Sequence, residues 1–176
     1  GIVARYTGRS TLNMVDEEKA RYKARQELFL DVIGKWHTAN SGAVLIFEGN
    51  SQYLLNTTLL GACDYIVVPS FAATSVEEIA FTMLMNASDG VPADRFLIGV
   101  AVPSMSDPSN QNGYFDGTDA DGNVRYALPF AAQWVVTPTD GYEKLGLYIV
   151  NAQDDYYNLT KTFKYIREAV DCMNPS

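Results

Sequence analysis

Histidine, cysteine and positive charge are scarce in this sequence, and each shortage narrows what the chain can do. Among its 176 residues there are one histidine, His37, and two cysteines, Cys63 and Cys172. A single histidine argues against a histidine-based metal site or a Ser-His catalytic triad, and we expect His37 to lie in a polar loop. Two cysteines make no disulfide framework, so we expect two thiols that are not bonded to each other.

Charge and hydropathy exclude two further classes of partner. The formal net charge is −8, and an acidic chain repels phosphate backbones, so we expect no nucleic-acid partner. No apolar run of the sequence is long enough to cross a bilayer. The first residue is not methionine and already belongs to an apolar run, so we expect a piece of a longer chain, in which a secretion signal would not be visible.

Strand and helix patterns alternate along the sequence, as is typical of a single α/β domain, here residues 1–176. Five short runs rich in β-branched and aromatic residues show little in-and-out alternation, which predicts parallel strands covered on both faces. These runs are 1–6, 43–47, 65–69, 96–102 and 145–150. The patterns between and after them predict helices over 14–36, 74–85, 126–136 and 159–173.

The predicted helices have apolar faces, and one has a clear start. Thr74 and Glu77 have the spacing of a capping box. One side of the first helix is predicted to carry Tyr22, Phe29, Ile33 and Trp36. The last helix is predicted to carry an apolar stripe of Leu159, Phe163, Ile166, Val170 and Met173.

Two architectures fit five strands with right-handed crossovers: an open doubly wound sheet, or part of an eight-stranded β/α barrel. A doubly wound nucleotide binder usually has a glycine-rich turn after its first strand. The sequence "YTGRSTLN" has neither G-x-G-x-x-G nor a P-loop. We therefore predict a barrel from this chemistry, because the strand pattern alone fits both.

In both architectures, ligands bind at the carboxyl ends of the strands. The polar segments at these ends supply the candidate site residues: Arg5, Tyr6, Thr7, Glu48, Asn50, Ser70, Phe71, Ser104, Asn151, Gln153 and Asp154.

The long segment 104–124 contains "DGTDADGN", which invites a calcium-site interpretation. Asp119, Asp121 and Asn123 have the first spacing of an EF-hand loop, but Val124 stands where the loop needs glycine. We predict a solvated hairpin here, and we expect neither a metal nor a cofactor.

Several stretches resemble the C-terminal half of family 18 glycoside hydrolase-like proteins. They are "DYIVVPSFAATSVEEIAFTMLMNASDGVPADRFLIGVAVPS", "NGYF", "AAQWVVTP", "LGLYIVNAQDDYYN" and "YIREAVDCMNPS". The resemblance is to the surface lipoproteins encoded with polysaccharide-utilisation systems in gut Bacteroidetes. It implies that the five strands are the fourth to eighth of a (β/α)8 TIM-type barrel. It also implies that another segment supplies the missing N-terminal units, and that the protein lies at the outer-membrane surface, in a glycan-uptake complex.

The family's signature, D-G-x-D-x-D-x-E on the fourth strand, falls on "GIVARYTG". Gly1 matches the signature glycine, Val3 and Arg5 match the second and third Asp, and Thr7 matches the Glu. In the family, this Glu protonates the glycosidic oxygen and an Asp orients the substrate's N-acetyl group, which acts as the nucleophile. Threonine cannot be a general acid near neutral pH, and arginine does not titrate. A fixed cation would also oppose the positive charge that develops on the sugar during cleavage.

The resemblance therefore implies a barrel that keeps the family's cleft, has no catalytic residue in this chain and binds a glycan. The residues placed to do so are Arg5, Glu48, Asn50, Phe71, Tyr114, Asn151, Gln153, Asp154 and Tyr156. Two alternatives stay open. One is an active endo-glycosidase that uses Glu48, Asp154 or residues upstream of this chain. The other is a structural component of an uptake complex, with no sugar site.

The position of Arg5 leads to a geometric prediction. Side chains alternate along a strand, so Val3, Arg5 and Thr7 share one face, which the resemblance makes the inward one. Glu48 ends the next strand, and neighbouring strands lie roughly 4.8 Å apart. We predict an ion pair between Arg5 and Glu48 across the mouth of the cleft, which would leave Glu48 ionised and a poor general acid.

Overall fold

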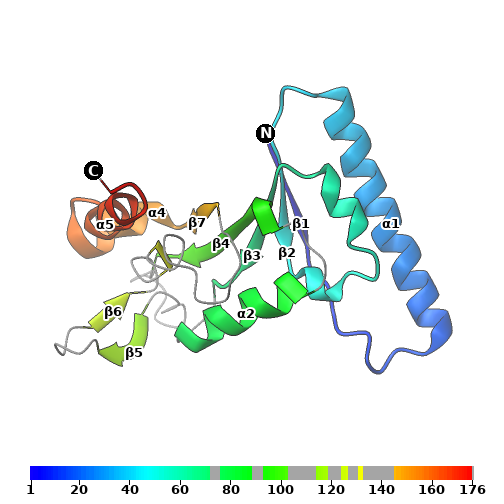
Figure 1. Ribbon diagram of the computed structural model, residues 1–176, viewed down its shortest axis with the longest axis horizontal. Coiled ribbons are helices and arrows are strands. Elements are labelled where there is room, and N and C mark those ends of the chain that lie inside the picture. The colour runs from blue at the N-terminus through cyan, green and yellow to red at the C-terminus, as the bar shows by residue number, and fades with distance from the viewer. Residues whose placement is uncertain are drawn as a thin grey trace.

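Five parallel strands in sequence order form the central sheet of the computed structural model (Figure 1). The structure describes residues 1–71, 76–88, 93–102, 114–118, 124–126, 131–132 and 145–175. The strands are β1 (Ile2–Tyr6), β2 (Leu45–Gly49), β3 (Tyr65–Pro69), β4 (Phe96–Ala101) and β7 (Gly146–Val150), in the order β1-β2-β3-β4-β7. The prediction of consecutive parallel strands is confirmed. This order differs from that of a doubly wound sheet, whose strand order reverses at a switch point.

Helices and helical turns connect the strands. They are α1 (Asp16–Ala39), η1 (Ser51–Tyr53), η2 (Thr58–Ala62), α2 (Val76–Ser88), η3 (Ala93–Arg95), α4 (Ala152–Asp154), the π-helical turn η4 (Asp155–Thr160) and α5 (Lys164–Met173). In Figure 1, α1 and α5 lie on opposite sides of the sheet, α1 on the side of β1 and β2 and α5 on the side of β7.

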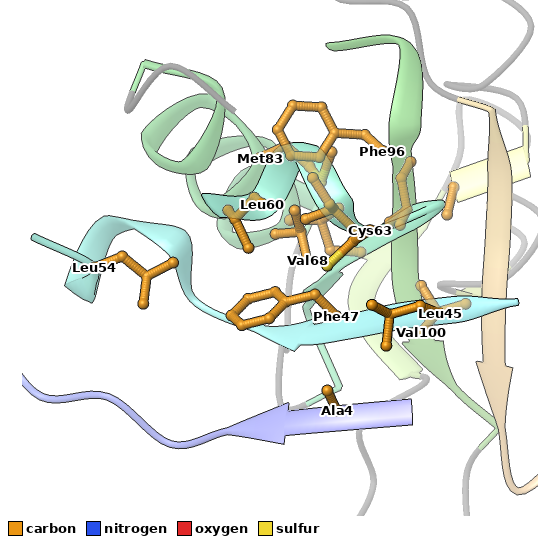
Figure 2. Packing of buried hydrophobic residues seen from close by; sticks show 14 of the residues in the cluster. Ala4, Leu45, Phe47, Leu54, Leu60, Cys63, Val68, Met83, Phe96 and Val100 are labelled. Atoms are coloured by element: carbon orange, nitrogen blue, oxygen red, sulfur yellow. The ribbon is translucent and has the colours of Figure 1, made fainter. Parts of the chain in front are cut away.

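The core lies between the helices and one face of the sheet. In Figure 2, Ala4, Phe47, Val68 and Val100, from four successive strands, point into the same cluster as side chains from the helical segments. These helical contributions include Leu30, Ile33, Leu60, Ile79, Met83 and Ala169. The opposite face of the sheet is less covered: Val3 and Tyr65 are each 37% exposed. The side chains at the site described below project from this second face.

The buried side of the first helix overlaps the predicted one, because Ile33 is buried and Phe29 packs against the core. Its buried residues are Gln26, Leu30 and Ile33, whereas Tyr22 and Trp36 are only half-buried. Gln26 can be buried because both polar atoms of its side-chain amide are hydrogen-bonded. Its Nε2 donates to the Tyr53 carbonyl at 2.7 Å, and its Oε1 accepts from the Leu55 amide at 2.9 Å. An apolar pattern does not predict such a residue in the core.

The predicted environment of His37 is wrong. Helix α1 continues to Ala39, so His37 lies in its last turn and not in a polar loop. Its Nε2 is 3.0 Å from Asp64 Oδ2 and 2.9 Å from the Ala43 carbonyl. The turn at Ala43 also explains why β2 begins at Leu45, two residues later than predicted.

The last helix is broken where continuity was predicted. The turn η4 ends at Thr160, and α5 begins at Lys164, with Lys161 and Phe163 in the left-handed region at φ 61° and 55°. The predicted apolar stripe is therefore wrong in part: Phe163 is 38% exposed and Val170 45% exposed. Ile166 and Met173 do pack against the core, as predicted.

A two-stranded antiparallel sheet, β5 (Tyr114–Thr118) with β6 (Val124–Tyr126), confirms the predicted hairpin. The helix predicted over 126–136 is wrong at its start, because Tyr126 ends β6. Residues 131–132 are helical, and both are buried. Other predictions fall outside the described residues, namely those for Thr74, Ser104 and the segment 119–123.

The two cysteines lie in different places and are not bonded to each other. Cys63 is buried in the core just before β3, and Cys172 is half-buried near the end of α5. Burial raises the pKa of the Cys63 thiol to about 11, which leaves it protonated at neutral pH.

Candidate functional site

Arg5 and Glu48 form the predicted ion pair. They are direct neighbours in the register between β1 and β2, and Arg5 Nε lies 3.0 Å from Glu48 Oε1. The side chain of Arg5 is 67% exposed and that of Glu48 only 12%. A largely exposed guanidinium thus covers a nearly buried carboxylate, which is the arrangement expected at the mouth of a cleft.

Arg5 also interacts with the side chain of Tyr148, on β7. This interaction, followed by that with Glu48, raises the pKa of Arg5 above its ordinary value, so the cation is permanent. Because β1 and β7 are the two edges of the five-stranded sheet, a flat sheet would hold these side chains far apart. The contact therefore requires a sheet that curves toward this face, as the wall of a barrel does.

A hollow of about 240 Å³ opens beside Arg5 at the carboxyl ends of β1, β2 and β3. It is lined by Arg5, Tyr6, Thr7, Gly8, Glu48, Gly49, Asn50, Pro69 and Phe71. Many of the residues predicted from the strand ends are thus brought together. Glu48 is the single carboxylate among the described residues that line the hollow.

Three oxygens at the ends of neighbouring strands are buried without a hydrogen-bond partner among the described residues: Glu48 Oε2, Asn50 Oδ1 and Ser70 Oγ. A buried polar atom left unpaired costs roughly 1–3 kcal/mol. Two of these atoms can only accept a hydrogen bond, and a hydroxyl can do either. A ligand rich in hydroxyl donors would satisfy them.

Phe71 supplies an apolar side to the hollow, and a glycine makes room for it. Its ring centroid lies 6.3 Å from that of Tyr148, with the planes tilted by 50°. A Cβ on Gly99 would lie 2.9 Å from Phe71 Cε1 and 2.8 Å from the Val68 carbonyl oxygen, closer than such contacts allow. Because Gly99 has no side chain, the ring of Phe71 can approach β4 closely and pack against Tyr148.

Comparison with known proteins identifies the family. The family model for glycoside hydrolase family 18, BT1044-like, matches residues 1–172. The chain belongs to this family. Among solved structures, it is similar to a selenomethionine form of BT1044 that carries a glutamate-to-glutamine substitution. The TM-score is 0.61 at 13% identity, over 86% of this chain and 45% of that one, so this likeness shows the fold. No curated protein matches the chain.

The family match confirms the predicted resemblance to family 18 glycoside hydrolase-like proteins, and the structural match confirms an α/β fold similar to that of BT1044. The chain spans about 45% of the length of the BT1044 structure that it matches. On β1 of this family 18 chain, Val3 and Arg5 share a face, while Ala4 between them is buried in the core. Thr7 follows the strand and lines the hollow.

The other predicted site residues of this family 18 chain lie elsewhere. Asn151, Gln153, Asp154 and Tyr156 follow β7, and none is among the residues that line the hollow. Tyr114 lies in β5, and its side chain is outside the described set. Glu48 and Asp154, the alternative pair of acids, are thus not joined in this hollow.

Sequence reasoning missed Tyr148 and Gly99. A signal for Tyr148 existed, because it is the one polar-tipped residue within the apolar run "LGLYIV". The closeness of Tyr148 to Arg5 depends on the curvature of the sheet, which cannot be read from the sequence.

The described part of the chain contains no group of three or more His, Cys, Asp or Glu side chains that could hold a metal ion. None of its helices is both long and apolar enough to cross a membrane.

Proposed function

We propose that the hollow beside Arg5 binds a glycan and that this chain does not cleave it by the mechanism of its family. The observation that carries the proposal is the Arg5–Glu48 ion pair, with its 3.0 Å separation, on the strand to which the family's acids align. A fixed guanidinium stands where the resemblance places an acid, and it engages the carboxylate of the neighbouring strand.

Cleavage by the family's route needs a carboxylic acid that can give a proton to the leaving oxygen. The described lining offers one carboxylate, Glu48, and one of its oxygens already contacts a cation. In the family's route the substrate's N-acetyl group is the nucleophile, and a second acid, an aspartate, orients it. The positions that the resemblance assigns to such groups carry Val3, Arg5 and Thr7.

Glycan binding fits the chemistry of the hollow. Sugar hydroxyls are donors as well as acceptors, and they match the unpaired oxygens of Glu48 and Asn50, two residues that line the hollow. The ring of Phe71 gives an apolar side on which the C–H face of a sugar can lie. A volume of about 240 Å³ is below the roughly 300–1,000 Å³ typical of pockets for larger ligands, so we assign it one sugar ring.

The proposal extends to the whole protein through the family resemblance alone. Further β/α units would complete the barrel around the second face of the sheet. The complete protein would capture a polysaccharide or glycoprotein glycan at the outer-membrane surface, as part of an uptake complex.

A binding screen with matched variants tests the proposal. The intact protein is applied to an array of N-glycans and N-acetyl-chito-oligosaccharides, and the affinity of each hit is measured by calorimetry. We expect Asn50→Ala to weaken binding, because it removes one unpaired acceptor. Asn13→Ala, at an exposed position before α1, should leave binding unchanged. Equal affinities for both variants and the native protein, or no binding to any glycan, would contradict the proposal.

A further inference from the structure

A second hollow, separate from the one beside Arg5, is lined mainly by arginines. It has a volume of about 200 Å³ and lies between the segment after β1 and the first turns of α1. The two hollows share no lining residue. The residues that line the second one are Arg9, Glu18, Arg21, Tyr22 and Arg25. Three positive charges against one negative leave a formal charge of +2, in a chain whose formal net charge is −8.

The hollow is held in shape by contacts between the segment after β1 and α1. The hydroxyl of Tyr22 accepts from the Arg9 amide at 2.8 Å and donates to the Arg9 carbonyl at 3.3 Å. Gly8 lets the segment lie this close, because a Cβ there would be 3.1 Å from the Tyr22 hydroxyl and 2.6 Å from Tyr53 Cβ. All the lining residues fall within the segment 9–25, so this chain builds the site from its own residues.

Arg25 has no acidic neighbour on its side of the helix. Arg21 Nη2 lies 2.7 Å from Glu17 Oε1, whereas the helix positions three and four residues from Arg25 carry no carboxylate. They hold Arg21, Tyr22, Leu28 and Phe29. Arg21 and Arg25 are four residues apart, and like charges at this spacing repel each other and destabilise a helix. A bound anion would relieve this repulsion.

The lining suits a doubly charged oxyanion. Guanidinium groups stay charged in proteins and hold sulfate or phosphate through forks of parallel N–H donors. The hydroxyl of Tyr22 already donates to the Arg9 backbone, so the donors left for an anion come from the arginines. The volume of about 200 Å³ is below the roughly 300–1,000 Å³ of pockets for larger ligands, so the hollow takes one such group.

We propose that the arginine-lined hollow is a binding site for a sulfate or phosphate group. The chemistry that it recognises is a tetrahedral oxyanion, either free or carried as an ester. Glu18 is the one acid of the lining. Its Oε2 accepts from the Val15 amide at 3.4 Å, which keeps this carboxylate at the start of α1, and its Oε1 is only loosely paired with Arg9 Nη2 at 3.8 Å. The inference is independent of the proposed glycan site.

Calorimetric titration of the intact protein tests the site. The probes are sodium sulfate and sodium phosphate, and sodium chloride at equal ionic strength is the blank. We expect saturable binding that is about tenfold weaker or more in Arg25→Gln, because the cation without an acidic neighbour is lost. Arg25→Lys keeps the charge but not the fork of donors, so its affinity should lie between those of the native protein and Arg25→Gln. Glycerol 3-phosphate, titrated beside inorganic phosphate, distinguishes an ester from the free ion as the source, and tighter binding of either supports the site.

Arg167→Gln on α5 is the matched control, because it removes the same charge from an exposed arginine that does not line the hollow. Asn50→Ala, in the glycan hollow, should also leave ion binding unchanged. No saturable binding by the native protein, as when an acid from another part of the protein fills the hollow, would overturn the proposal. Equal affinities of the native protein and Arg25→Gln, or equal losses in Arg25→Gln and Arg167→Gln, would overturn it as well. None of these results bears on the proposed function.

Discussion

The side chains of Arg5 on β1 and Tyr148 on β7 interact, although they lie on the two outermost strands of a five-stranded sheet. This interaction requires a sheet that curves enough for its edges to face each other. It also brings a permanent cation, a phenol and the nearly buried Glu48 to the same end of the sheet.

The first prediction concerns this link. Tyr148→Phe removes the phenol group that interacts with Arg5 but keeps the ring against Phe71. We expect glycan binding to weaken about two- to tenfold, because Arg5 loses one of the two groups that orient it. Tyr65→Phe, a 37% exposed tyrosine on β3, is the control, and calorimetry is the measurement. Equal affinities in the two variants would show that Tyr148 does not position Arg5.

Restoring one acid should not restore catalysis. In Thr7→Glu, the new carboxyl group would stand in the hollow beside Arg5, and Val3 and Arg5 would still replace the other two acids of the aligned signature. We expect no release of sugar from an N-glycan or from a chito-oligosaccharide, as measured by chromatography of the labelled glycan. Turnover by this single variant would mean that the remaining machinery is intact.

The space left by Gly99 supplies a third prediction. In Gly99→Ala, the new methyl group would meet the Val68 carbonyl and the ring of Phe71 at about 2.8–2.9 Å. We expect a loss of roughly 1–3 kcal/mol in the free energy of unfolding, as for other overpacked sites, together with weaker glycan binding. The control is Gly61→Ala, where a Cβ would meet no atom within 4 Å. It should change stability by less than about 0.5 kcal/mol. Denaturant unfolding of both variants measures the difference.

The buried thiol of Cys63 makes stability depend on alkaline pH. Its pKa is raised from 9.0 to about 11 by burial, so the folded state keeps a proton that the unfolded chain loses. This contribution to stability is complete below pH 9 and falls as the pH rises toward 11. We expect iodoacetamide to leave Cys63 unmodified at pH 8 in the native state and to modify it after unfolding, as peptide mass spectrometry can show. Rapid alkylation in the folded protein would contradict its burial.

Much of the fold and part of the site could be predicted because they follow from local pattern. The apolar runs predicted the five parallel strands. The alternation of side chains along β1, together with the order of the strands, predicted the Arg5–Glu48 pair. The contact of Arg5 with Tyr148 could not be predicted in this way, since it depends on the accumulated curvature of five strands. The place of Gln26 in the core depends on the backbone groups of a distant turn.

The C-terminal segment shows a different limit of sequence reasoning. Spacing alone favoured one continuous helix, but Lys161 and Phe163 adopt left-handed conformations that non-glycine residues seldom take. The break leaves Phe163, an expected core residue, 38% exposed. His37 was misplaced for a simpler reason, because α1 continues beyond its last buried apolar residue, Ile33.

Mass spectrometry of the glycan recovered from the intact protein tests most directly whether the site binds without cleaving. The protein is incubated with an array-identified glycan, separated from unbound sugar and then denatured to release what it holds. We expect the glycan to be recovered at its full mass, and in a smaller amount from Asn50→Ala. Shortened glycan, with its production abolished by Glu48→Gln, would show instead that this is a working glycosidase.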